Sequence, residues 1–134
     1  MKNLKVFIID ESLFFRRWFR KLIRALPGIQ IIGEAKDPLS ALNIIRRVKP
    51  DVIIMDIKVQ WRFGIDLVKN ISKVNPIPRV IMLTSEVWRR QQPKVPGKAD
   101  FLIDKLTEYN KIPEILNDLI RLRVRHQIPG AHCF

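Results

Sequence analysis

The chain contains almost no cysteine, because Cys133 is the only one among its 134 residues. A single thiol excludes a disulfide framework and a cysteine-based metal site within one chain. Long apolar runs are also missing, since no stretch approaches the roughly 20 residues that a membrane-spanning helix needs. The N-terminus, MKNLKVFIID, lacks the apolar core and the small-residue cleavage site of a signal peptide. We therefore expect a cytoplasmic protein.

Acidic side chains are in the minority, with 13 Asp and Glu against 25 Lys and Arg, and the formal net charge is +12. This excess favours negatively charged partners such as nucleic acid, an anionic membrane surface or an acidic protein face. A basic surface that is only solvated explains the same charge, so composition leaves the partner open. With 47% hydrophobic residues, the chain is long enough for one domain with a core and too short for two ordinary ones.

Segments typical of strands and of helices alternate along the chain. The predicted strands are Leu4–Ile9, Ile29–Glu34, Val52–Met55, Arg79–Leu83 and Phe101–Ile103. The predicted helices are Leu13–Leu26, Asp37–Val48, Gly64–Val74, Glu86–Gly97 and Ile112–Arg125. Pro93, Pro96 and Gly97 limit the fourth helix to about two turns. Repeated strand–helix units in a short chain predict an α/β fold, with a parallel sheet covered by helices on both faces.

Two of the apolar strands end in acidic residues. Asp10 and Glu11 follow the first strand, and Asp56 closes the most apolar run of the chain. Open α/β sheets bind their ligands outside the carboxyl ends of the strands. Carboxylates that converge there repel one another unless a cation lies among them. The pattern indicates an acidic pocket for a hard divalent metal, although Asp10 and Glu11 also suit the cap of the helix that follows.

Four predicted strand ends together supply one set of polar residues. The set is Asp10, Glu11, Asp56, Thr84 and Lys105. With the stretches FIIDES, IIGEAKDPLSAL, PDVIIMDI, RVIMLTS and ADFLIDK, this set resembles the receiver domain of bacterial response regulators (CheY-like domains). The resemblance extends from Lys5 to about Leu122. It implies a flavodoxin-like (βα)5 fold with strand order 2-1-3-4-5 and a receiver domain over residues 1–125. Pro129 and Gly130 predict a loosely ordered basic and apolar tail over residues 126–134.

The resemblance implies a phosphoacceptor. Asp56 would take a phosphoryl group from the phosphohistidine of a sensor histidine kinase or a histidine phosphotransfer protein. Thr84 would bond the phosphoryl oxygen, and Lys105 would pair with Asp56 or with its phosphoryl group. These roles agree with the chemistry of phosphoryl transfer, which depends on positioning and on neutralisation of the phosphoryl oxygens.

The same resemblance implies a bound Mg²⁺. Asp10, Glu11, Asp56 and the backbone carbonyl of Lys58 would be its ligands, in keeping with the preference of Mg²⁺ for oxygen. On this interpretation the protein is not an enzyme. It is a signalling domain that promotes its own phosphorylation and dephosphorylation and signals through altered protein contacts.

The chain departs from the family pattern after Asp56. Residues 59–64 read Val-Gln-Trp-Arg-Phe-Gly where the family usually has Met-Pro followed by Asp-Gly. Lys58 places a cation beside the phosphoacceptor, where it would either prolong the phosphoryl group's lifetime or obstruct the attacking water; the sequence leaves both open. Leu102 occupies the usual switch-aromatic position, and Phe101 precedes it. We expect intact chemistry with an unusual output.

The basic residues allow a second function. The first predicted helix interleaves arginines with aromatic residues, which predicts a solvated basic face over an apolar one. The alternative is a pseudo-receiver, a constitutive basic interaction module with nucleic acid as a candidate ligand, although no DNA-binding module fits in the remaining residues. A flavin-binding module is set aside, because Asp10, Glu11 and Ser12 stand where a phosphate-binding loop is needed. Trp88, Phe101 and the last helix form a candidate surface for a homodimer or a downstream target.

Overall fold

The structure is a computed structural model that describes residues 3–91 and 99–127. In chain order the elements are β1 (Leu4–Ile9), α1 (Leu13–Arg24), β2 (Ile29–Ala35), α2 (Pro38–Val48), β3 (Val52–Asp56), the 3₁₀ turns η1 (Ile57–Val59) and η2 (Arg62–Gly64), α3 (Leu67–Ile71), β4 (Arg79–Thr84), α4 (Glu86–Gln91), β5 (Phe101–Asp104) and α5 (Lys111–Gln127). Within these ranges no helix has the length and apolar character needed to cross a membrane.

The strands form one parallel sheet in the order β2-β1-β3-β4-β5, which confirms the predicted α/β class and strand order. Every residue of β3 is buried, as expected for the middle strand of a sheet covered on both faces. Because all strands run in the same direction, their carboxyl ends meet at one edge. The register pairs Ile9 with Met55, Asp56 with Leu83 and Thr84 with Asp104, so the polar strand ends are brought level.

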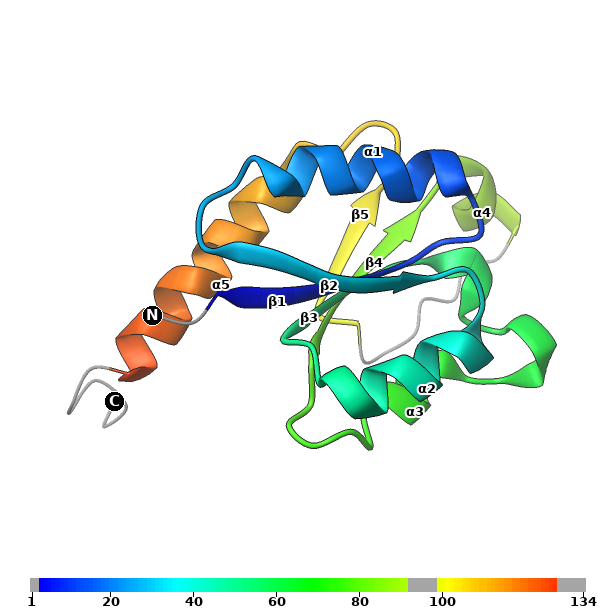
Figure 1. Cartoon of the computed structure of the whole chain (residues 1–134). Helices are drawn as coiled ribbons and strands as arrows, with labels where there is room; N and C mark the ends of the chain where they lie inside the picture. The colour runs from blue at the N-terminus through cyan, green and yellow to red at the C-terminus, as the bar shows by residue number, and fades with distance from the viewer. Residues whose placement is uncertain (1–2, 92–98, 128–134) are drawn as a thin grey trace.

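Helices cover both faces of the sheet, and α2 and α3 lie together on the face opposite α1 (Figure 1). Each face has its own hydrophobic cluster. The first cluster includes Phe19 and Ile23 of α1 with Ile112 and Leu116 of α5. The second includes Leu42 and Ile45 of α2 with Leu67, Val68 and Ile71 of α3. The apolar side chains of the strands alternate between the two clusters, which is how one sheet supports two cores.

Short polar residues set the starts of the helices. Asp37 caps α2 by accepting a hydrogen bond from the Ser40 N–H, with Pro38 in the first turn, as predicted. The third helix begins later than predicted, at Leu67 rather than near Gly64. Asp66 accepts a hydrogen bond from the Lys69 N–H and acts as the cap, so the preceding residues form the separate turn η2.

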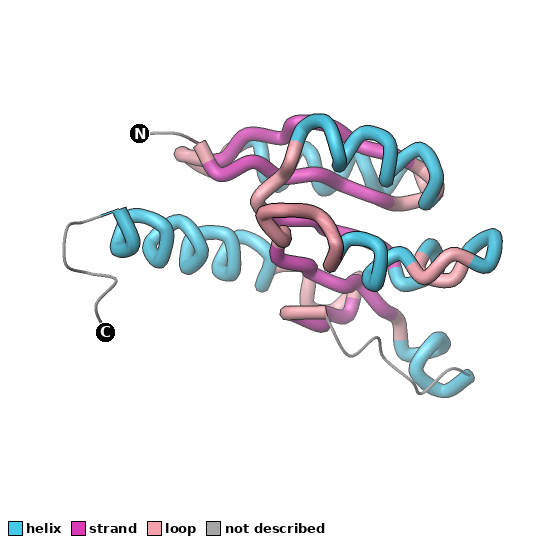
Figure 2. The backbone as a smooth tube through the Cα atoms, turned by 90° about the horizontal axis from the view of Figure 1, so that it is seen from below, coloured by secondary structure: helices cyan, strands magenta, loops and turns pink. Residues whose placement is uncertain are grey.

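The last two helices, α4 and α5, both adjoin residues outside the described part of the chain. α4 covers Glu86–Gln91, whereas the prolines that were expected to shorten it belong to residues 92–98, outside the described part of the chain. α5 continues beyond the strands (Figure 2). Its Arg123 donates hydrogen bonds to the Asn3 carbonyl and the Asp51 carboxylate. Of the predicted tail 126–134, residues 126 and 127 lie in α5 and the rest lie outside the described residues.

Candidate functional site

Two carboxylates lie side by side at the carboxyl edge of the sheet. Asp10 directly follows β1, and Asp56 is the last residue of β3, the adjacent strand. Only 1% of Asp10 and 5% of Asp56 is exposed. A buried carboxylate is stable only when a positive charge or hydrogen bonds compensate for its lost solvation, so both groups are expected to have such partners.

Lys105 supplies the compensating positive charge. Its Nζ donates a hydrogen bond to Asp56 Oδ2 at 2.7 Å and forms an ion pair with Asp10 Oδ2 at 2.6 Å. The same ammonium lies 3.8 Å from the centre of the Phe15 ring, in cation–π geometry. The Lys105 N–H donates to the Thr84 carbonyl at 2.8 Å, which ties the start of this segment to the end of β4. One ammonium therefore bridges both acids.

The other oxygen of each carboxylate accepts a backbone hydrogen bond. The Ser12 N–H donates to Asp10 Oδ1 at 2.9 Å, and the Lys58 N–H donates to Asp56 Oδ1 at 3.0 Å. Burial raises the pKa of Asp10 above its usual value, and the Asp56 carboxylate raises it further, although Lys105 and the Ser12 N–H oppose both. The cap of α1 is Ser12 itself, whose side chain accepts from the Phe15 N–H, and not Asp10 or Glu11.

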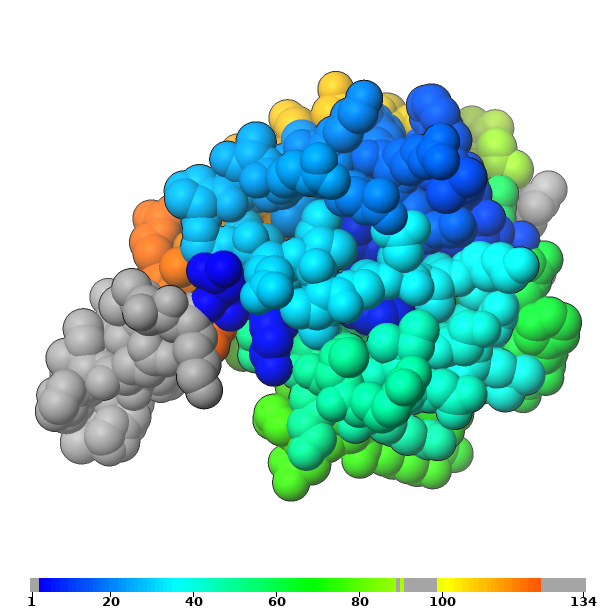
Figure 3. Space-filling model, in the orientation of Figure 1, coloured from blue at the N-terminus to red at the C-terminus, as the bar shows by residue number. Residues whose placement is uncertain are grey.

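Glu11 does not join the two aspartates. Its carboxylate forms an ion pair with Arg62 of η2 at the molecular surface. The start of α1 and the segment that follows β3 lie at the same end of the molecule, at the right of Figure 3. In the parts of the chain that the structure describes, no three His, Cys, Asp or Glu side chains gather closely enough to hold a metal ion. The structure thus brings together Asp10, Asp56 and Lys105, whereas Glu11 pairs with Arg62.

Thr84 and Lys58 flank the acidic pair in different ways. Thr84 is 2% exposed, and its hydroxyl donates only a long hydrogen bond, 3.5 Å, to the Ser85 carbonyl. A contact of this length holds the hydroxyl weakly, so the group is available to a better acceptor. Lys58 is exposed, while its backbone N–H is bound to Asp56.

Arg16 was expected on a solvated face, and this expectation is wrong. Its side chain is 13% exposed, and its guanidinium donates to the carbonyl oxygens of Asp10 at 2.6 Å and Glu11 at 3.3 Å. It also forms an ion pair with Glu34 on β2, which Arg20 shares one helical turn later. The spacing of two arginines four residues apart was visible in the sequence. Their common partner on another strand was not.

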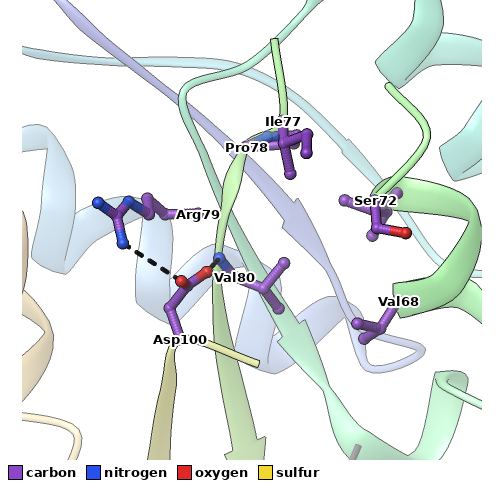
Figure 4. Close-up of a pocket in the computed structure, with 8 residues that line it drawn as sticks. Val68, Ser72, Ile77, Pro78, Arg79, Val80 and Asp100 are labelled. Carbon is purple, nitrogen blue, oxygen red and sulfur yellow. Dashed lines mark hydrogen bonds and ion pairs between the residues drawn. The ribbon is translucent and has the colours of Figure 1, made fainter. Parts of the chain in front are cut away.

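One hollow of the described surface lies away from this cluster. A cavity of about 540 Å³ opens near the amino end of β4, where it is lined by Val68, Ser72, Ile77, Pro78 and Asp100, among others (Figure 4). The Asp100 carboxylate is already bound by the Val80 N–H at 2.7 Å and by Arg79 at 3.3 Å. Its polar group is satisfied by the chain itself, and the buried cluster of Asp10, Asp56 and Lys105 lies at the opposite edge of the sheet.

The sequence model of one family, the response regulator receiver domain, matches residues 6–116. The chain belongs to this family. Among solved structures, the receiver resembles the response regulator domain of Thermotoga maritima CheB, with a TM-score of 0.64, 28% identity, and coverage of 90% of this chain and 92% of the other. The REC domain of AraT from Geobacillus stearothermophilus reaches a TM-score of 0.75 at 21% identity, covering 93% and 98%, which shows the common fold.

The curated relatives are larger proteins named protein-glutamate methylesterase/protein-glutamine glutaminase. The relative from Carboxydothermus hydrogenoformans is 34% identical over 92% of this chain and 37% of its own length. That from Pseudoalteromonas atlantica is 36% identical over 96% of this chain and 35% of its own length. The receiver thus spans about a third of these relatives. The expectation that the protein is not an enzyme is wrong, because its relatives are named as enzymes.

The aromatic residues near β5 do not share one surface. Trp88 packs against the cluster under α2 and α3, whereas Phe101 packs against the cluster under α1 and α5. Leu102, at the switch-aromatic position, is exposed. The sheet edge separates the two aromatic side chains, so the candidate face that combined them with α5 is split between the two sides of the receiver.

Proposed function

We propose that this receiver accepts a phosphoryl group on Asp56 from the phosphohistidine of a sensor histidine kinase or a histidine phosphotransfer protein. The bridge from Lys105 to both buried aspartates is the observation that carries the proposal. An oxygen of Asp56 forms the new P–O bond as the P–N bond to the imidazole breaks, and later attack by water releases inorganic phosphate. The phosphorylated receiver then signals through altered protein contacts, to a downstream target that the chain does not name.

The contacts support a defined role for each neighbour of Asp56. The Lys58 N–H on Oδ1 fixes the orientation of the carboxylate, which lowers the entropy lost on reaction with the phosphoryl donor. The Lys105 ammonium, 2.7 Å from Oδ2, offsets the negative charge that the phosphoryl oxygens bring. The weakly held Thr84 hydroxyl, at the end of the adjacent strand, is a donor that can turn to a phosphoryl oxygen. Together they replace solvent around the transferred group.

The donor set fits Mg²⁺. Fixed carboxylates at neighbouring strand ends are oxygen ligands of the kind this ion takes. Burial, which raises the pKa of Asp10, disfavours the ionised carboxylate, and a nearby cation would favour it. Asp10, Asp56, Glu11 once freed from Arg62, and the backbone carbonyl of Lys58 would hold the ion. When bound, Mg²⁺ supplies charge neutralisation for the phosphoryl oxygens. Its binding would require the Lys105 ammonium to share the Asp10 and Asp56 oxygens that it now bridges.

The exposed face of α1 suits a protein partner. Leu13 and Phe14 are exposed there, Phe14 at 71%, and they line a shallow hollow of about 400 Å³ together with Arg17, Trp18 and Lys21. Apolar side chains rimmed by cations favour an acidic protein with an apolar centre, and charge accelerates such encounters. This surface adjoins the site, since α1 begins three residues after Asp10. The alternative, a constitutive basic module that binds nucleic acid, would leave the buried Lys105–Asp56–Asp10 cluster without a use.

Phosphorylation is tested by intact mass after incubation with acetyl phosphate and Mg²⁺. We expect one added phosphoryl group in the wild type, none in Asp56→Asn, and none without Mg²⁺. Asp118→Asn is the matched control, because Asp118 is exposed on α5, pairs there with Arg121, and its loss should leave the modification intact. An unmodified wild-type protein whose thermal unfolding is cooperative would contradict the proposal and favour the constitutive module.

We also propose that the receiver controls a protein-glutamate methylesterase/glutaminase activity. The supporting observation is the identity of 34–36% to relatives of that name over more than nine-tenths of this chain. The test is methanol release from methyl-esterified glutamate peptides by the full gene product that contains this receiver, with and without acetyl phosphate. We expect phosphorylation to change the rate at least several-fold, and Asp56→Asn to abolish the change. Activity that ignores acetyl phosphate would refute this control.

A further inference from the structure

Glu11 is held by a cation of the chain itself. Its carboxylate forms a close ion pair with Arg62, and both side chains remain partly exposed, 36% and 41%. Arg62 belongs to η2, a segment far from Glu11 in the sequence that follows the phosphoacceptor strand. Glu11 is also one of the proposed oxygen donors for Mg²⁺. The same carboxylate therefore has two competing cationic partners.

The backbone beneath Glu11 is braced, so its side chain is the part free to change partner. Arg16 donates to the carbonyl oxygens of both Asp10 and Glu11, and Glu34 holds the same guanidinium from β2. The Asp10 side chain is fixed by Lys105 and by the Ser12 N–H. Exchange of Arg62 for a metal ion then calls for rotation of the Glu11 side chain, while the backbone of Asp10 and Glu11 stays held by Arg16.

The segment that carries Arg62 is anchored at its base. The buried Gln60 side chain donates to Asp66 Oδ1 at 2.6 Å and accepts from the Val68 N–H at 2.9 Å, which ties the start of the segment to α3. Phe63, next to Arg62, has a φ of 57°, a left-handed conformation that a bulky residue rarely adopts. The Arg62 guanidinium also lies 6.0 Å from the centre of the Phe63 ring. The turn is thus a defined conformation that presents Arg62 to Glu11.

The contact between Arg62 and Glu11 affects the net charge of the acidic pocket. Asp10, Glu11 and Asp56 carry three negative charges, and Lys105 and Arg62 offset two of them. Loss of Arg62 would leave a more negative pocket and an unpaired Glu11. Resting on the phosphoacceptor function proposed above, we propose that Arg62 is a built-in competitor of Mg²⁺ for Glu11, and that it sets the affinity of the receiver for the ion.

The test is calorimetric titration of the purified chain with Mg²⁺, which measures binding without any phosphorylation. Because a partly exposed ion pair contributes modestly, we expect Arg62→Ala to tighten binding by about two- to fivefold. Arg62→Lys keeps the charge and should stay within about twofold of the wild type. Arg90→Ala is the matched control, since Arg90 pairs with Glu86 on α4, outside the cluster, and should not change the affinity.

A double-mutant cycle separates the contact from a general charge effect. Glu11→Gln should weaken Mg²⁺ binding, and in that background Arg62→Ala should change the affinity by less than about twofold. If Arg62→Ala tightens Mg²⁺ binding as much in the Glu11→Gln background as in the wild type, the proposed competition is wrong. It is also wrong if the wild type binds Mg²⁺ and Arg62→Ala binds it with the same affinity. Either result leaves the phosphoacceptor proposal standing. If neither the wild type nor Arg62→Ala binds Mg²⁺, and each unfolds cooperatively on heating, then the phosphoacceptor proposal and the competition proposal are both overturned.

Discussion

Lys105 is the residue on which the acidic pair depends. Its ammonium contacts both buried carboxylates, and the Phe15 ring covers it from the α1 side. Buried ion pairs gain little over an apolar replacement of the whole group, but removal of one partner leaves an uncompensated charge. Removal of Lys105 would leave both Asp10 and Asp56 with an uncompensated negative charge. The same lysine therefore serves the fold and the proposed chemistry.

We expect Lys105→Met to lower the free energy of unfolding by about 3 kcal/mol at neutral pH, because it strands two buried carboxylates. Urea denaturation measures this change. Adding Asp10→Asn to Lys105→Met should restore part of the loss, since only one charge then remains. Lys111→Met is the control, because the Lys111–Glu108 pair is exposed and its loss should leave the midpoint unchanged. Equal effects of the two lysine substitutions would contradict this account.

At the scale of elements, α1 is fastened to β2 by charge as well as by apolar packing. Arg16 and Arg20, on one side of the helix, both pair with Glu34. Burial raises the pKa of Glu34, but hydrogen bonds from Arg20 and Arg16 outweigh it, so the pKa lies below its usual 4.5. A lowered pKa means that the ionised form is favoured by folding. The stabilisation is therefore present above pH 4.5 and is lost as the pH falls through the folded-state pKa.

Replacement of Glu34 by glutamine tests this link. At pH 7 we expect Glu34→Gln to be less stable than the wild type by about 1 kcal/mol, the magnitude of a partly exposed ion pair. Below pH 4.5 the difference should shrink as the wild-type carboxylate takes up a proton. Denaturant unfolding at a series of pH values measures it, with the exposed Glu86→Gln as the control. A difference that is constant from pH 7 to pH 3 would show that shape, not charge, is responsible.

At the scale of the whole molecule, two groups of basic residues differ in their surroundings. Several arginines are bound within the chain: Arg16, Arg20, Arg62, Arg79, Arg90, Arg121 and Arg123. Arg17 and Lys21 line the exposed hollow on α1 instead. The net charge of +12 thus overstates how much of the basic surface is available to a partner. The basic residues of α1 beside the site are the candidate contacts for an acidic partner.

Much of the fold and part of the site were predictable from local patterns. Apolar runs of strand length that end in Asp10, Asp56 and Thr84 predict both the parallel sheet and the convergence of these residues, because parallel strands share a carboxyl edge. The later start of α3 was missed, because it depends on Asp66 taking the role of cap in place of a helix that begins near Gly64. Local signals identify a cap residue but do not rank competing ones.

The amino-acid sequence by itself determined the alternation of strands and helices, the acidic strand ends and the membership in the receiver family, since each depends on residues close together in the chain or on the order of motifs along it. Only the tertiary structure decided which charges meet. Lys105 bridges Asp10 and Asp56, while Glu11 pairs with Arg62 and not with the aspartates. Partners far apart in sequence are selected by the path of the backbone and by burial, and neither is written in the local pattern of residues.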